Sequence, residues 1–155
     1  MRWLKLWAPP ILWACVIWSF STGTFTDKNT SRYIVPFLHW LLPWASEHTL
    51  LALHYLIRKS GHVTEYFVLS LLVLRGLRAG RKEMHLGWAA EAVAIVAIYA
   101  ALDEFHQSFV PGRTPAVSDV LLDTAGGIAA QIVAALVMLW GDVRQGRAGE
   151  TQKAG

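Results

Sequence analysis

Residues 124–141 read Thr124-Ala-Gly-Gly-Ile-Ala-Ala-Gln-Ile-Val-Ala-Ala-Leu-Val-Met-Leu-Trp-Gly141, a run of 18 residues without a charged side chain. Apolar residues occupy every side of a helix built from this run, whereas a helix on the surface of a soluble protein keeps one polar face. A helix needs about 20 residues to cross the hydrocarbon core of a bilayer. The run therefore predicts a membrane-spanning helix near residues 118–140.

Three more stretches of the chain have the length and composition of membrane spans. The first lies between Lys5 and Asp27 and contains 21 residues without a charge. The other two are apolar stretches that a few ionisable side chains interrupt. We therefore predict an all-α fold, namely an integral membrane four-helix bundle. The four expected spans lie near residues 4–22, 55–75, 85–106 and 118–140.

Composition excludes several other classes of protein. Hydrophobic residues make up 54% of the 155 residues and charged residues 16%, against about 25% charged residues in an average soluble domain. This balance excludes a disordered chain, and the single cysteine, Cys15, excludes a disulfide-stapled domain. Pro9 and Pro10 in the first span favour a retained anchor over a cleaved signal peptide. The length suits a single membrane domain over residues 1–140 and a polar tail over residues 141–155.

Lys and Arg are distributed unevenly along the chain, and this bias predicts its orientation. With four spans, nine of the 14 basic residues fall on the side of the two termini and five on the other side. Links rich in Lys and Arg stay in the cytoplasm, so we expect an inner-membrane protein with both termini cytoplasmic. The net charge of +3 follows from this bias and requires no nucleic-acid partner. The nine residues are Arg2, Lys5, Arg75, Arg78, Arg81, Lys82, Arg144, Arg147 and Lys153.

The first outer link, residues 23–54, contains an apolar segment of its own. Residues 33–46 carry no charge but are too few to cross a bilayer, and Pro36 and Pro43 interrupt them. Tyrosine and tryptophan, which are frequent here, favour the headgroup level of a membrane. The pattern predicts an interfacial or re-entrant segment in this loop, either a lipid-binding surface or an apolar cover over the bundle.

Ionisable residues open the second span, where a charged side chain is costly unless it finds a partner. Lys59, His62 and Tyr66 follow one another at intervals of three and four residues, so they share one face of a helix. Glu65 lies one turn beyond His62. Since His62 and Glu65 lie deeper than ordinary interface anchors, we predict that they face the bundle interior.

The third and fourth spans carry polar residues at the same membrane level. Asp103 and Gln107 are one turn apart at the end of the third span, and Asp119 and Asp123 are one turn apart at the start of the fourth. Asp119 also suits the first turn of a helix, whereas Asp123 lies too deep for this explanation. We call the combined set the outer polar cluster: Lys59, His62, Glu65, Tyr66, Asp103, Glu104, Gln107, Arg113, Asp119 and Asp123.

Two interpretations of the outer polar cluster remain open. In the first, salt bridges and hydrogen bonds lock the bundle together, and the cluster has no other role. In the second, the cluster is a binding or catalytic site that opens to the outer face. Five carboxyl groups cannot all ionise at this depth without partners, so we expect Lys59 and Arg113 to pair with Asp or Glu.

Three motifs of the cluster resemble those of the VanZ-like family of integral membrane proteins. The resemblance runs from about Trp18 to Gln131, and Asp123 stands where many members carry asparagine, which adds a carboxyl group to the site. The family is named for a member linked to glycopeptide resistance, which implies work near the outer leaflet or on cell-wall precursors. The motifs are Lys59-x-x-His62-x-x-Glu65-Tyr66, Asp103-Glu104-x-x-Gln107-x-Phe109-x-Pro111-Gly112-Arg113 and Asp119-x-x-x-Asp123-x-x-Gly126.

The first function class that fits is recognition of a lipid or lipid-linked anionic group at the outer leaflet, such as a cell-wall precursor. Lys59 and Arg113 would hold phosphate, and Gln107 would add hydrogen bonds. The interfacial aromatic residues would hold an acyl chain. The binding residues expected here are Lys59, Tyr66, Glu104, Gln107, Arg113, Asp119 and Asp123.

The second class is an enzyme that modifies or cleaves such a lipid. His62 would act as general base, oriented by Glu65 or Asp103. A carboxyl group of the fourth span would act as acid, or the carboxylates would together hold a divalent metal. The third class is a purely structural polar network. A proton-coupled transporter is disfavoured, because Glu91 is the only ionisable candidate in the inner half of the bundle.

Overall fold

The computed structural model describes residues 2–81, 83 and 85–153, with side chains up to Gly141 and at Arg144. Every regular element in these ranges is helical, which confirms the all-α prediction. The elements are α1 (Arg2–Phe20), the short 3-10 helix η1 (Gly23–Phe25), α2 (Asp27–Leu41), α3 (Glu47–Arg78), α4 (Leu86–Gln107) and α5 (Val117–Lys153).

Three helices of the described chain are long and apolar enough to cross a membrane. They are α1, α4 and the Val117–Gly141 part of α5. These spans agree with three of the four predicted ones and indicate a multi-pass membrane protein. Helix α3 contains the remaining predicted span, but it carries more charged residues and is not among the helices that are apolar enough to cross a membrane by composition. Its 32 residues measure about 48 Å at 1.5 Å per residue.

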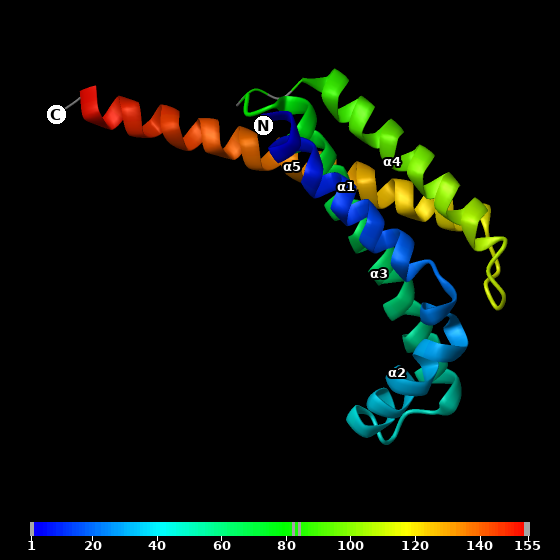
Figure 1. Ribbon diagram of the computed structural model, residues 1–155. Coiled ribbons are helices and arrows are strands. Elements are labelled where there is room, and N and C mark those ends of the chain that lie inside the picture. The colour runs from blue at the N-terminus through cyan, green and yellow to red at the C-terminus, as the bar shows by residue number, and fades with distance from the viewer. Residues whose placement is uncertain (1, 82, 84, 154–155) are drawn as a thin grey trace.

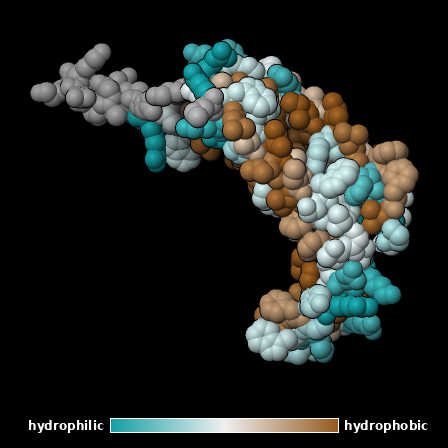
Figure 2. Space-filling model, viewed as in Figure 1, coloured by the Kyte–Doolittle hydropathy of each residue, from teal (hydrophilic) through white to brown (hydrophobic). Residues whose placement is uncertain are grey.

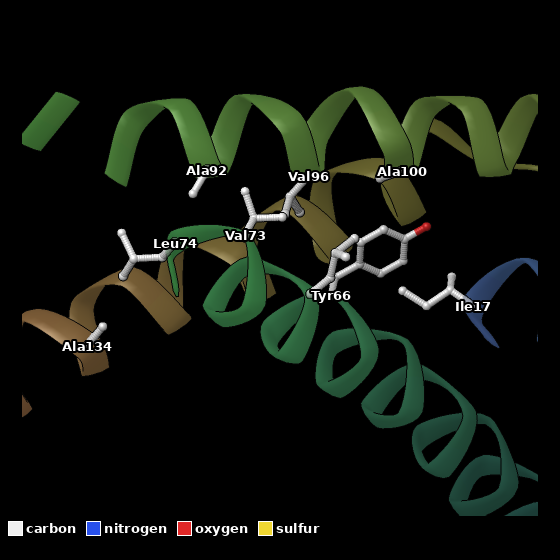
Figure 3. Packing of buried hydrophobic residues seen from close by; sticks show 9 residues of the cluster. Ile17, Tyr66, Val73, Leu74, Ala92, Val96, Ala100 and Ala134 are labelled. Carbon is white, nitrogen blue, oxygen red and sulfur yellow. The ribbon is translucent and has the colours of Figure 1, made fainter. Parts of the chain in front are cut away.

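Helices α3, α4 and α5 pack along one another, and α1 lies along α3 (Figure 1). Tyr66 and Val73 of α3, Val96 of α4 and Ile17 of α1 meet in the apolar core (Figure 3). Apolar side chains also cover the outside of the bundle, and hydrophilic ones gather towards its ends (Figure 2). This distribution is the one expected where lipid, and not water, surrounds the helices.

Two glycines permit the close approach of α5 to its neighbours, Gly126 to α3 and Gly127 to α4. A Cβ atom on Gly126 would lie 2.7 Å from the carbonyl oxygen of Val63, and one on Gly127 would lie 2.9 Å from Val96 Cγ1. Small residues at such crossings let helix backbones approach within membranes. Gly126 belongs to one of the three motifs, so this crossing explains a part of the sequence pattern that carries no chemistry.

Helix α2 folds back onto the first half of α3, and together they form an arm that extends from the bundle (Figure 1). Thr26 begins α2 by accepting a hydrogen bond from the backbone N–H of Asn29. Pro36 lies inside α2, so the prediction that it breaks this segment was wrong. The helix ends at Leu41, just before Pro43. The segment is thus a regular amphipathic helix followed by a turn.

The basic N-terminus and the basic link after α3 lie at the same end of the bundle. The Arg2 guanidinium donates a hydrogen bond to the carbonyl oxygen of Ala79, 3.0 Å away, so the N-terminus lies beside the link that follows α3. The later part of α5 starts from the same end (Figure 1) and remains helical through Lys153, across the segment predicted as a polar tail. Lys82 of the basic link lies outside the described residues.

Candidate functional site

The outer polar cluster gathers at the end of the bundle opposite the N-terminus. The end of α1, the middle of α3, the end of α4 and the start of α5 meet there (Figure 1). Asp103, Asp123 and Tyr66 are each at most 1% exposed, and Glu104 and Gln107 are also buried. These five are the fully buried members, whereas His62 and Glu65, the two side chains predicted to face the bundle interior, are partly buried.

Asp103 is the centre of a hydrogen-bonded group that links α4 to α1. Its Oδ2 accepts hydrogen bonds from Ser21 Oγ at 2.7 Å and from Gln107 Nε2 at 2.9 Å. Ser21 is one of three hydroxyl residues at or just after the end of α1. Ser19 and Thr22 instead donate to backbone carbonyl groups of their own segment, so Ser21 alone contributes.

Two carboxylates of the cluster have clear structural partners. Asp119 forms an ion pair with Lys59, as the excess of carboxyl groups predicts. Glu104 Oε2 accepts a hydrogen bond from the backbone N–H of Ala116, 2.9 Å away, directly before α5. A carboxylate at a helix N-terminus is stabilised by the helix dipole. Glu104 therefore joins α4 to the start of α5.

Asp123 lies closest to His62, on the facing helix. Their nearest atoms, Asp123 Oδ2 and His62 Nδ1, are 3.9 Å apart, which is longer than a hydrogen bond. The side chains are 2% and 20% exposed. Glu65, which the sequence offers as a partner of His62, is half-buried one turn away. The structure thus pairs His62 most closely with a residue of the fourth predicted span.

Arg113 follows the Pro111-Gly112 turn and reaches α1. Its Nη2 donates a hydrogen bond to the carbonyl oxygen of Phe20 at 2.6 Å, so the predicted pairing with a carboxylate is replaced by a backbone contact. Burial lowers the pKa of Arg113, and nearby Arg58 lowers it further, whereas Asp103 raises it. Guanidinium groups keep their charge in proteins, so the site retains a partly buried cation.

Hydrogen-bonding capacity remains unused throughout the cluster. Folded proteins satisfy roughly 90% or more of their buried polar groups, so a concentration of exceptions indicates a place for a ligand or for water. Within the described chain, five buried atoms of the cluster lack a hydrogen-bond partner. They are His62 Nδ1, Tyr66 Oη, Asp103 Oδ1, Arg113 Nε and Asp123 Oδ1.

A cavity of about 220 Å³ opens beside two of these five residues, His62 and Arg113. Five members of the outer polar cluster line it, together with residues of α2, α3 and the α4–α5 link. Arg58 and Asp27 belong to the lining and lie outside the predicted set. Arg58 donates to Thr30 Oγ1 at 2.8 Å and lies 3.6 Å from Asp27. The lining residues are Asp27, Tyr55, Arg58, Lys59, His62, Gln107, Gly112, Arg113, Thr114 and Asp119.

The carboxylates do not converge on a metal position. Among the residues with described side chains, no three His, Cys, Asp or Glu side chains come together as metal ligands. Glu104 points to the start of α5 and Asp119 to Lys59. Their oxygens are therefore separated by the contacts that hold the helices together.

The family model described as VanZ/LLP1 matches residues 6–138. The match covers all ten residues of the outer polar cluster, the whole of α4, and most of α1 and of the Val117–Gly141 part of α5. No match was found among curated proteins or among solved structures.

Proposed function

Because this chain belongs to the VanZ/LLP1 family, we propose that it is an envelope membrane protein that recognises the anionic group of a lipid or lipid-linked molecule at the outer leaflet. The carrying observation is the cavity of about 220 Å³, at which Arg58, Lys59 and Arg113 contribute cationic groups. Arg113 Nε is buried there without a partner among the described residues. Guanidinium and ammonium groups are the side chains that bind phosphate.

The proposal requires that α3 crosses the bilayer from about Lys59 to Arg78. Twenty residues at 1.5 Å per residue span about 30 Å, which matches the hydrocarbon core. The preceding turns of α3 would then stand outside the core, at the level of the cavity. Lys59 and Asp119 neutralise each other at this boundary, which lowers the cost of placing them near lipid.

Helix α2 would lie at the headgroup level beside the cavity. Tyr33, Trp40 and Trp44 are 80%, 75% and 80% exposed, and aromatic residues of this kind favour the interface between lipid and water. Since Asp27 of α2 also lines the cavity, an arm resting on the leaflet would present the cavity to headgroups.

Lipid retention tests this function directly. The full chain would be reconstituted in nanodiscs of equal parts phosphatidylethanolamine, phosphatidylglycerol and phosphatidylcholine, released, and examined for bound lipid by native mass spectrometry. We expect Arg113→Ala to retain about tenfold less phospholipid, since a charged hydrogen bond is lost. The control Arg75→Ala lies at the other end of α3 and should behave as wild type. Equal retention by wild type and Arg113→Ala contradicts the proposal.

The crossing of α3 has a separate test. Topology reporters fused within residues 75–82 should report the cytoplasm, and reporters at Gly112 should report the outer side. An outward-facing reporter in the 75–82 link would place the cavity on the wrong side of the membrane.

A second candidate function is hydrolysis of the same headgroup, and the pairing of His62 with Asp123 favours it. His62 lines the cavity, and a carboxylate 3.9 Å from its ring could orient the imidazole as a general base for water. The enzyme hypothesis expects His62→Gln to abolish release of the headgroup from vesicles while lipid retention persists. If wild type releases no headgroup under any condition that permits retention, recognition without chemistry is the remaining function.

A further inference from the structure

The charges that line the cavity cancel one another except for one. Three cationic side chains and two carboxylates belong to the lining, namely Arg58, Lys59 and Arg113 against Asp27 and Asp119. Apart from histidine, the lining therefore carries one net positive charge at neutral pH. A charged ligand is recognised through complementary charge, so this balance limits the charge that the ligand can bring.

Two of the three cations of the lining have carboxylate partners. Lys59 of α3 forms an ion pair with Asp119 of α5. Arg58 Nε, also on α3, lies 3.6 Å from Asp27 Oδ1 of α2. A ligand would compete with these carboxylates for the same ammonium and guanidinium groups. Neither Lys59 nor Arg58 therefore offers a full positive charge to a ligand.

Arg113 is the third cation, and its contacts leave its charge uncompensated. It takes part in none of the ion pairs among the described side chains. Its Nη2 donates to the carbonyl oxygen of Phe20, and its Nε is a buried donor without an acceptor among the described residues. A carbonyl group carries no net charge. Arg113 therefore supplies the one positive charge that the lining does not neutralise.

Histidine and the deeper carboxyl groups add no further positive charge. His62 Nδ1 lies 3.9 Å from Asp123 Oδ2, so a carboxyl group opposes any charge on a protonated ring. The carboxyl groups of Asp103 and Glu104 lie near enough to Arg113 to interact with it electrostatically. A second negative charge on the ligand would meet these groups without a cation of its own, beside lipid, where charge is expensive.

From this balance we infer that the group recognised in the cavity carries one negative charge, as a phosphodiester does, and not two, as a phosphomonoester or a diphosphate does. The inference rests on the proposed function and names the chemical class of its ligand. A phosphodiester has one acidic proton to lose, whereas a phosphomonoester loses a second at about pH 6. Arg113 balances the single charge, and the two ion pairs of the lining stay intact.

A matched pair of lipids tests the inference. Phosphatidylmethanol and phosphatidic acid differ by one methyl ester, which keeps the first a monoanion. The full chain would be reconstituted in phosphatidylcholine nanodiscs that contain equal amounts of the two lipids, and the retained lipid would be measured by native mass spectrometry. At about pH 8 the phosphomonoester of phosphatidic acid carries nearly two charges. We expect wild type to retain about tenfold more phosphatidylmethanol than phosphatidic acid.

Removing a carboxylate from the lining should abolish this preference. Asp119→Asn leaves Lys59 without its partner. Asp27→Asn removes the carboxylate beside Arg58. Each variant gives the lining a second uncompensated cation, so phosphatidic acid should gain about tenfold relative to phosphatidylmethanol. The control Glu47→Gln changes the net charge by the same amount, but Glu47 is exposed and lies outside the lining, so this variant should keep the wild-type ratio.

The outcomes separate this inference from the proposed function. If wild type retains phosphatidic acid as well as phosphatidylmethanol or better, or if both carboxylate variants keep the wild-type ratio, the single-charge inference is overturned. Anionic recognition then still stands as long as retention depends on Arg113. Retention that is independent of Arg113 overturns both.

Two further features of the design keep the result clear. Soluble dimethyl phosphate displaces the lipid if the phosphodiester alone is recognised, whereas lack of displacement alongside the lipid preference assigns the ligand as a lipid-linked phosphodiester. The wild-type comparison requires no substitution, so the inference stays testable if a carboxylate variant fails to fold.

Discussion

Two buried polar groups lie between helices of the bundle and differ in how many of their atoms lack a hydrogen-bond partner. In the second half of α3, Ser70 Oγ donates to the Gly127 carbonyl oxygen of α5 at 2.9 Å, and Gln131 Nε2 donates to Ser70 Oγ at 2.7 Å. Only Gln131 Oε1 of this neutral group lacks a partner among the described atoms. The outer polar cluster is charged and leaves five such atoms.

The difference separates a structural contact from a site. Neutral side chains that satisfy one another across helices hold a membrane bundle together, and the Ser70–Gln131 pair fits that role. Cavity size does not make the same distinction, because the larger cavity, about 990 Å³, is lined by apolar residues of α4 and α5 together with Glu83 and Gln131. The outer polar cluster differs from the larger cavity because it combines charged side chains with buried polar atoms that have no hydrogen-bond partner among the described residues.

The largest expected effect on stability comes from disrupting the close packing of α5 against α3, on which both polar groups depend. Gly126→Leu places a Cβ against the backbone of Val63, where 2.7 Å separates the ideal Cβ from the carbonyl oxygen. We expect a loss of about 3 kcal/mol of stability from this overpacking, measured as a lower thermal midpoint. The control Gly141→Leu has open space at its Cβ and should melt as wild type does. Equal midpoints for the two variants would show that α5 does not approach α3 as described.

The next prediction compares stability and lipid retention between variants of the two polar groups. Ser70→Ala removes two buried hydrogen bonds of the Ser70 hydroxyl, the one it donates to the Gly127 carbonyl oxygen and the one it accepts from Gln131 Nε2. Gln131 Nε2 keeps the Ser70 carbonyl oxygen as an acceptor at 3.2 Å. Each lost hydrogen bond costs about 0.5–1.5 kcal/mol, so we expect a loss of about 1–3 kcal/mol. Lipid retention should remain unchanged because Ser70 lies away from the cavity lining. Arg113→Ala should show the converse, with reduced lipid retention and a smaller change in the thermal midpoint. Reduced lipid retention in Ser70→Ala would contradict the distinction between the two groups.

A smaller effect concerns the arm of α2 and α3. His54 is 2% exposed and contacts Thr30 of α2. Burial lowers the pKa of His54, with Asp27 raising it and Arg58 lowering it. The docked imidazole thus resists protonation, so docking of α2 should be complete above the ordinary histidine pKa of about 6.5 and should weaken as the pH falls below it. Hydrogen exchange of α2 measured above and below about pH 6.5 checks this, with His54→Gln as the pH-insensitive comparison.

The smallest expected effect is at the Lys59–Asp119 ion pair. Its side chains are 23% and 20% exposed, and partly exposed pairs contribute about 0–1 kcal/mol. A double-mutant cycle with Lys59→Met and Asp119→Asn should give a coupling energy in that range. A much larger coupling energy would show that the pair is a structural contact of the protein interior and not a partly exposed pair at the edge of the site.

Much of this architecture could be predicted from the sequence because membrane helices obey local rules. The apolar runs predicted both ends of α1 and α4 and the start of α5 within two residues. The end of α5 was missed, because the helix continues to Lys153 and the predicted span stops at residue 140. Gln107 Nε2 donates to Asp103 Oδ2, as their spacing of one turn allows. The arm was less predictable. Pro36 is tolerated inside α2, and the first turns of α3 are helical although the predicted span begins at residue 55.

Partners across helices were the least predictable part of the site. The sequence indicates that Arg113 and Glu104 need partners, but their observed partners are backbone groups of Phe20 and Ala116. Backbone groups occur at every residue and leave no mark in a sequence. Ser21 has two other hydroxyl residues beside it, Ser19 and Thr22, and only the rotation of α1 against α4 brings Ser21 to Asp103.

The sequence by itself determined the all-helical membrane class and the location of the scarce charges, since burial of the peptide backbone in lipid demands helices and charge in lipid is expensive. Tertiary structure alone decided which buried charges are satisfied. That outcome depends on distances of a few ångströms between helices far apart in the chain, such as the 3.9 Å from His62 to Asp123. A hydrogen bond is lost when the distance between donor and acceptor grows by less than about 1 Å. Only the packed bundle therefore shows that Asp103 and Asp123 each have an Oδ1 atom without a hydrogen-bond donor among the described residues.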